Sequence, residues 1–245
     1  MCSMYGIHWD YVLLTALWGG LTSLERRAFL QAMISRPLVA GTVTGLLLHD
    51  VNAGLLIGVL FELLYLGGVS LGGVQAEHET LPTVAASAMA AAMGDESGGE
   101  ATPAMLAISV LVFAPAGRLG RLVEGALDTR ANRYAARLRE AVDAGELRRA
   151  VRQNLRALWP QFALYALVSG AAALAGFLVL PFEREVPLPV LRGLAWAWPA
   201  MGVVAAGVAL QGNRARGRFA WAGASAAVTL GLLAVGAWLS GRPPP

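Results

Sequence analysis

The fold is decided by residues Gln31 to Gly73, which read QAMISRPLVAGTVTGLLLHDVNAGLLIGVLFELLYLGGVSLGG. The apolar run from Pro37 to Leu48 has only 12 residues, whereas a helix needs about 20 to cross the hydrocarbon core of a bilayer. A His-Asp pair ends this run, and a second, glycine-rich run follows from Ala53 to Gly73 with one acid, Glu62. Two apolar runs separated by polar residues predict a re-entrant or broken membrane segment, a structure typical of binding sites in secondary transporters.

The composition places the whole chain in a membrane. Of its 245 residues 56% are hydrophobic and only 14% are charged, where soluble domains carry about a quarter charged residues. The sequence therefore predicts an all-α membrane protein, a polytopic helical bundle with broken or re-entrant segments in its N-terminal half. The single cysteine, Cys2, excludes a disulfide framework and a thiol metal cluster, and the first residues lack the basic start of a cleaved signal peptide.

The remaining spans and the orientation follow from length and charge. The stretches Gln161–Leu180, Leu191–Leu210 and Phe219–Leu239 are each long enough to cross a membrane. The arginine-rich stretch Arg118–Arg156 is predicted to be cytoplasmic by the positive-inside rule, with both chain termini outside. We expect three regions, 1–117, 118–156 and 157–245, and in the second a pair of amphipathic helices that turns at Asp143 to Gly145. Such a basic helix pair can lie on lipid headgroups or dock a cytoplasmic partner. The acidic residues among its arginines argue against nucleic-acid binding.

Glu62 is the sharpest single signal. It follows Gly54 and Gly58 at four-residue spacing, so all three share one helix face, and a stripe of small residues predicts a closely packed neighbouring helix. An acid inside the membrane is costly and marks a functional site by default. Two interpretations stay open, contact with a solute and a hydrogen-bonded carboxylate that bridges two helices. Asp50 and Ser35, each just before an apolar run, are predicted helix N-caps.

A second polar cluster, Gln75, Glu77, His78 and Glu79, follows the glycine-rich turn. Amide, carboxylate and imidazole groups can grip sugar hydroxyls, although a solvated loop would look the same. A metal is disfavoured because no second histidine lies at ligand spacing. His49 beside Asp50 fits either a proton relay or a helix end. No nucleophilic triad or Walker loop is present in the sequence, so we expect no catalytic residue, no metal and no cofactor.

The run Gln31 to Gly73 closely resembles the signature of the membrane subunit IIC of the mannose/fructose/sorbose class of the bacterial phosphoenolpyruvate-dependent sugar phosphotransferase system. Arg36 and Pro37 match its Arg-Pro pair, Asp50 its acid after the short segment, and Glu62 the acid of its Leu-Glu-Leu motif. The resemblance implies a sugar permease in the bacterial inner (cytoplasmic) membrane. It also implies a hetero-oligomer with the membrane subunit IID and with cytoplasmic IIB and IIA proteins, which carry the phosphoryl group.

We therefore expect a hexose-type sugar to be bound by Glu62, Asp50, Gln75, His78 and Arg36. We also expect the chain to depend on IID, whose helices would cover the Gly54 and Gly58 stripe. This chain has His49 where many members have glycine, and Glu77-His78 near their Pro-Asp pair. Two other functions stay open, a transport-deficient sensor or scaffold that binds the same partners, and a proton-coupled carrier that uses Glu62 and His49.

Overall fold

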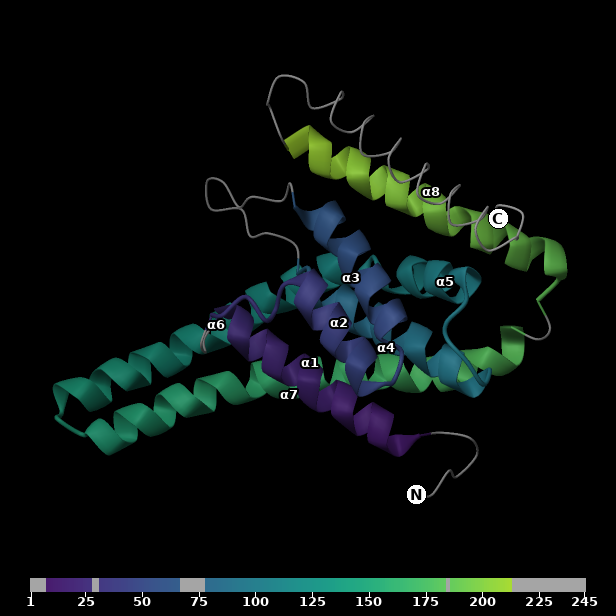
Figure 1. The fold of residues 1–245 in the computed structure, drawn as a ribbon. Coiled ribbons are helices and arrows are strands. Elements are labelled where there is room, and N and C mark those ends of the chain that lie inside the picture. Colours follow the sequence, from purple (N-terminus) through teal and green to yellow (C-terminus); the bar gives the residue numbers. More distant parts are fainter. Residues whose placement is uncertain (1–7, 28–30, 67–77, 184–185, 213–245) are drawn as a thin grey trace.

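Every regular element in the described part of the chain is an α-helix (Figure 1). The computed structural model describes residues 8–27, 31–66, 78–183 and 186–212. In chain order the helices are α1 (Trp9–Arg27), α2 (Pro37–Leu47), α3 (Val51–Tyr65), α4 (Thr80–Glu96), α5 (Pro103–Phe113), α6 (Ala116–Asp143), α7 (Leu147–Glu183) and α8 (Leu188–Gly212). The predicted helical bundle with short, broken elements in its N-terminal half is confirmed.

Within the described residues, three helical stretches are long and apolar enough to cross a membrane, Pro103–Asp143, Leu147–Leu178 and Leu188–Leu210. The predicted spans at 161–180 and 191–210 overlap the last two, and the predicted span at 219–239 lies outside the described residues. The first stretch joins α5 to α6, because Ala114 and Pro115 keep helical backbone angles between them. The apolar residues of α5, too few to cross alone, thereby continue into a longer helix.

The short helices α2 and α3 form a tight antiparallel hairpin, and glycine is what allows it. A Cβ on Gly45 would lie 2.9 Å from the Cα of Gly54, and one on Gly41 would lie 3.0 Å from the Cα of Gly58. Contacts this short leave room for hydrogen only, so the two backbones touch along the hairpin. The neighbour of the Gly54 and Gly58 stripe is therefore α2 of the same chain. The expectation that IID covers this stripe is wrong.

The two predicted caps have different outcomes. Asp50 caps α3 as predicted, since its carboxylate accepts a hydrogen bond from the backbone N–H of Ala53 at 2.9 Å. Its other oxygen accepts from the N–H of Ala101 at 2.7 Å, which ties the hairpin turn to the start of α5. The Ser35 cap is wrong. Arg36 is the N-cap residue of α2 and makes no side-chain cap, while Pro37 occupies the first turn, where its missing N–H leaves no unsatisfied donor.

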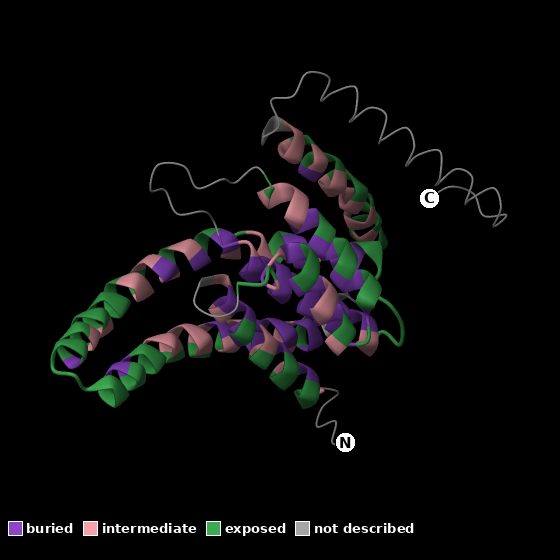
Figure 2. Cartoon of the chain, turned by 60° about the vertical axis from the view of Figure 1, so that its left-hand side comes forward, coloured by how far each residue is buried: buried purple, intermediate pink, exposed green. Residues whose placement is uncertain are grey.

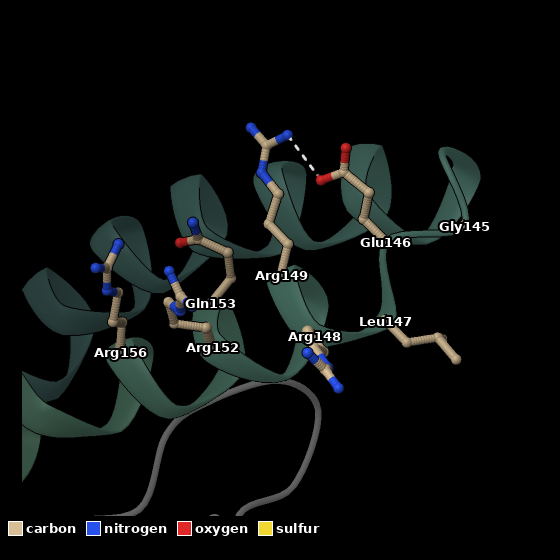
Figure 3. Close-up of a pocket in the computed structure, with 8 residues that line it drawn as sticks. All are labelled: Gly145, Glu146, Leu147, Arg148, Arg149, Arg152, Gln153 and Arg156. Carbon is tan, nitrogen blue, oxygen red and sulfur yellow. Dashed lines mark hydrogen bonds and ion pairs between the residues drawn. The ribbon is translucent and has the colours of Figure 1, made fainter.

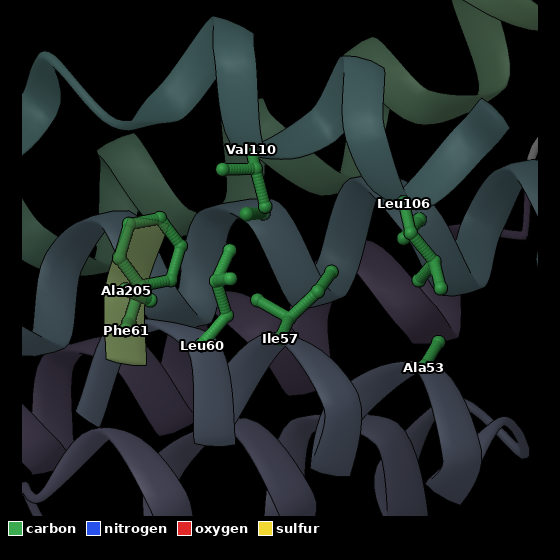
Figure 4. Close-up of a cluster of buried hydrophobic side chains, with 9 residues drawn as sticks. Ala53, Ile57, Leu60, Phe61, Leu106, Val110 and Ala205 are labelled. Carbon is green, nitrogen blue, oxygen red and sulfur yellow. The ribbon is translucent and has the colours of Figure 1, made fainter. Parts of the chain in front are cut away.

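Helix α4 is the centre of the bundle. Its residues from Thr80 to Gly94 are all buried, and α1, α2, α3, α5, α6 and α7 pack around it. A helix buried on every side needs small residues, and α4 is rich in alanine. A cluster of buried apolar side chains joins α4 to α3, α5 and α8 through residues such as Ile57, Leu106 and Ala205 (Figure 4).

Helices α6 and α7 form a long hairpin that extends from the bundle to one side (Figure 1). Its far half is mostly exposed (Figure 2). Helix α6 ends at Asp143 and Gly145 adopts a positive φ of 72°, so the predicted turn at Asp143 to Gly145 is confirmed. Helix α7 then continues over 37 residues, through position 157 without a break. We call residues 118–156 the arm.

Candidate functional site

A chain of alternating charges joins the ends of α1 and α3 and the residues just before α2 and α4 to the interior of α6. Glu62, near the end of α3, has its Oε1 3.7 Å from Nη1 of Arg36, and that same Nη1 lies 3.8 Å from Oε2 of Glu79. Arg26, near the end of α1, places Nη1 3.7 Å from Oε1 of Glu79 and Nε 3.6 Å from Oε1 of Glu124 on α6. The charges therefore alternate in sign from α3 to α6, as groups sharing a low-dielectric site require.

We call these five charged residues, Glu62, Arg36, Glu79, Arg26 and Glu124, the ion-pair chain, and His78 adjoins its Glu124 end. Its Nε2 lies 3.7 Å from Oε1 of Glu124, while its Nδ1 accepts a hydrogen bond from the backbone N–H of Leu81 at 3.1 Å. Accepting at Nδ1 leaves the proton of a neutral imidazole on Nε2, directed toward the carboxylate. The ring stacks on Tyr165 of α7, with centroids 4.5 Å apart. His78 thus belongs to the packed interior between α4, α6 and α7 and is not part of a solvated loop.

The ion-pair chain has an open end and a closed end. The side chains of Glu62 and Arg36 are 21% and 42% exposed, whereas those of Glu124 and His78 are 4% and 1% exposed. A polar solute can reach the first pair, and the second is shut off by protein. The open end is therefore where a ligand rich in hydroxyl groups can find both a carboxylate acceptor and a guanidinium donor.

Glu62 also has a structural contact. Its Oε2 accepts a hydrogen bond from the backbone N–H of Leu38 at 3.3 Å, in the first turn of α2. The carboxylate thus supplies the acceptor for this helix start that a capping side chain would provide, and its negative charge favours the positive end of the helix dipole. Nearby, Glu25 fixes the preceding turn by accepting from the N–H groups of Ile34 and Ser35 at 3.3 and 2.8 Å.

The five predicted site residues do not all come together. Glu62 and Arg36 belong to the ion-pair chain, His78 adjoins its Glu124 end, and Gln75 lies outside the described residues. Asp50 sits at the other end of the hairpin, about 18 Å along α3 from Glu62 at 1.5 Å per residue. His49, exposed beside Asp50, is equally far, so the hairpin keeps it apart from Glu62. Among the described residues no group of three or more His, Cys, Asp or Glu side chains could hold a metal ion.

Sequence reasoning missed Arg26 and Glu124 as members of the site. A usable signal existed for Glu124, because Gly117 and Gly120 precede it at helical spacing, as Gly54 and Gly58 precede Glu62. A Cβ on Gly120 would lie 2.6 Å from the Cβ of His78, so this face of α6 touches the start of α4. Glycines one and two turns before a lone glutamate thus precede the acid at both ends of the ion-pair chain, the partly exposed Glu62 and the buried Glu124.

Comparison with known proteins agrees with this architecture. Residues 9–211 match the family model described as the sorbose-specific IIC component of the phosphotransferase system. An Escherichia coli (strain K12) protein described as N-acetylgalactosamine permease IIC component 2 is 33% identical over 78 residues, which are 31% of this chain and 59% of that protein. The matched stretch thus spans less than two thirds of that relative.

Two solved structures share the fold. A structure described as a membrane protein has a TM-score of 0.66, and the mannose transporter ManYZ, solved in complex with microcin E492, has a TM-score of 0.59. Each is 20% identical to this chain, and each match covers 96% of this chain and 94% of the other. Since the family model covers most of the sequence, this chain belongs to the IIC membrane components of the mannose class of the sugar phosphotransferase system.

Proposed function

We propose that this chain is a sugar permease subunit that forms a translocation path and sugar site in the bacterial inner membrane. Uptake is coupled to phosphorylation by partner proteins, the membrane subunit IID and the cytoplasmic IIB and IIA proteins. The observation that carries the proposal is the partly exposed pair of Glu62 and Arg36, held at 3.7 Å where a broken helix begins. No residue of this chain needs to act as a nucleophile, because the partners carry the phosphoryl group.

The sugar contacts are assigned to the open end of the ion-pair chain. Glu62 accepts hydrogen bonds from sugar hydroxyls, and Arg36 donates to sugar oxygens. Hydrogen bonds to charged groups contribute about 1.5 to 3 kcal/mol each, enough to hold a small polar solute. His78 supports the site from within, Asp50 fixes the opposite end of the hairpin, and Gln75 is a further candidate contact from the segment before α4.

The test is sugar affinity of the purified chain in complex with IID, for Glu62→Gln and Glu62→Ala. The probes are mannose, sorbose and N-acetylgalactosamine, the sugars in the names of the matched family and relatives. If Glu62 contacts sugar, both variants bind at least about tenfold more weakly, roughly 1.4 kcal/mol, while assembly with IID persists. Glu25→Gln is the matched control, because that buried carboxylate contacts the backbone of Ile34 and Ser35.

The two interpretations of Glu62, sugar contact and a structural carboxylate, predict different changes in sugar affinity and thermal stability. If Glu62 is only structural, its replacement by Ala lowers thermal stability before it lowers sugar affinity. The Gln variant, whose side-chain oxygen can still accept from the N–H of Leu38, then largely keeps the wild-type stability. Wild-type affinity in the assembled Glu62→Gln complex would remove Glu62 from the site. Uptake of labelled sugar with and without a phosphoryl donor then decides between a working permease and a transport-deficient scaffold.

A further inference from the structure

The tip of the arm stands well outside the hydrocarbon of a membrane. Helix α7 has 37 residues and is about 55 Å long, against about 30 Å of hydrocarbon. Trp159 is largely exposed just before the apolar part of α7, where aromatic residues mark the membrane boundary. From Trp159 to Leu147 the helix extends about 18 Å further. The first three turns of α7 are therefore exposed to water.

This part of α7 nevertheless carries an exposed apolar row. Leu147, Val151 and Leu155 are 71%, 61% and 61% exposed, and their four-residue spacing places them on one face. Arg148 and Arg152 follow at the same spacing and form a basic row beside it. An exposed apolar patch with a polar border is typical of a protein contact surface.

The charge of the arm defines the chemistry of the partner. Between positions 130 and 156 there are eight arginines and three acids, although the net charge of the whole chain is only +3. Beside the apolar row, a shallow groove of about 670 Å³ is lined by four arginines, and Figure 3 shows one ion contact there, from Arg149 to Glu146. Among the described residues, Arg148, Arg152 and Arg156 make no ion pair. Such a surface attracts carboxylates.

A lipid surface fits this face poorly. An amphipathic helix that binds headgroups lies in the plane of the membrane. Helix α7 is continuous from Leu147 through Pro160 into its membrane-crossing part, so its first turns follow the direction of the span. We propose that the face formed by Leu147, Val151 and Leu155 with the adjacent arginines docks a water-soluble protein whose contact surface is an apolar groove bordered by carboxylates. The inference rests on the proposed function in one respect, because the proposed function supplies the protein used as the probe, the cytoplasmic IIB protein.

The experiment measures the affinity of purified IIB for the full chain with IID, in nanodiscs of neutral lipid at about 0.15 M salt. Arg148→Glu/Arg152→Glu reverses two charges beside the apolar row. Arg130→Glu/Arg133→Glu makes the same charge change on exposed positions of α6 and is the matched control. We expect at least tenfold weaker IIB binding for the first pair and less than threefold weaker binding for the second, with sugar affinity unchanged in both.

Equal IIB affinity for the two double variants overturns the docking face, and so does a wild-type complex that binds sugar but not IIB. Loss of sugar binding with intact IIB docking counts instead against the proposed function. A fluorescent dye attached to Val151→Cys, in a chain that also carries Cys2→Ser, tests whether this face binds a lipid surface instead. If vesicles containing phosphatidylglycerol shift its emission as lipid burial does, and IIB does not, the face binds lipid and the proposal is wrong.

Discussion

Replacing Arg26 by Gln removes a cation from the ion-pair chain, so that the carboxylates of Glu79 and Glu124 both lose an ion-pair partner. Nε of Arg26 lies 3.6 Å from Glu124, whose side chain is 4% exposed, and Nη1 lies 3.7 Å from Glu79. Removing one partner of a buried ion pair costs about 3 to 5 kcal/mol. The Arg26 side chain is itself 17% exposed, so we take the lower end of this range, about 3 kcal/mol.

The assay is thermal unfolding of the purified full chain with its IID partner. For a chain of this size 1 kcal/mol shifts Tm by about 2 to 4 °C, so Arg26→Gln is expected to lower Tm by about 6 to 12 °C. Arg149→Gln is the matched control. Its ion pair with Glu146 is shorter, 3.1 Å, but both side chains are more than half exposed, so its loss is expected to lower Tm by less than about 2 °C.

A double variant checks the mechanism. Arg26→Gln/Glu124→Gln removes both charges of the pair, so its loss of stability should be smaller than the sum of the single losses by about 1 to 3 kcal/mol. Equal Tm changes for Arg26→Gln and Arg149→Gln would refute the argument that burial, and not distance, sets the strength of these pairs. Strict additivity in the double variant would show that Arg26 and Glu124 do not interact.

Three further changes test the fold. Gly54→Ala forces a Cβ into the backbone of α2 and should destabilise the complex by about 1 to 3 kcal/mol, whereas Gly125→Ala, with open space around it, should be neutral or stabilising in a Tm measurement. Asp50→Ala removes the cap of α3 and the tie to the α5 turn and should cost about 1 to 2 kcal/mol, with Asp50→Asn less harmful. With Cys2 replaced, a cysteine at Arg137 should react only with reagents that reach the cytoplasmic side, and labelling from outside would reverse the predicted orientation.

Much of the membrane architecture could be predicted because its signals are local. The hairpin follows from two apolar runs that are too short or too broken to span, and from Pro37 and Asp50 at the starts of its helices. The turn between α6 and α7 follows from the end of an apolar period near Gly145. These features depend on neighbouring residues, which a single sequence displays.

Pairings across the fold were not predictable in the same way. Periodicity shows that Gly54 and Gly58 face a close neighbouring helix, but it does not identify that helix. The neighbour is α2, whereas a helix of IID was expected. Arg26 and Glu124 are 98 positions apart and meet only because α1 and α6 both pack near the start of α4. Ser35 failed as a cap because a carboxylate from α3 took the acceptor position instead. In each case the observed partner lies on another helix, which a local sequence pattern does not identify.

The sharing of charges explains why the two ends of the ion-pair chain should respond differently. Arg36 faces both Glu62 and Glu79, so a sugar that engages Glu62 still leaves Arg36 with a carboxylate partner. At the closed end, Arg26 bridges Glu79 and Glu124, so its loss removes the central cation from both carboxylates. Under the proposed function, Glu62→Gln therefore lowers sugar affinity about tenfold with Tm changed by less than about 2 °C, whereas Arg26→Gln lowers Tm first. If both variants lose affinity and Tm in the same proportion, the ion-pair chain acts as one structural unit and Glu62 has no separate role in binding.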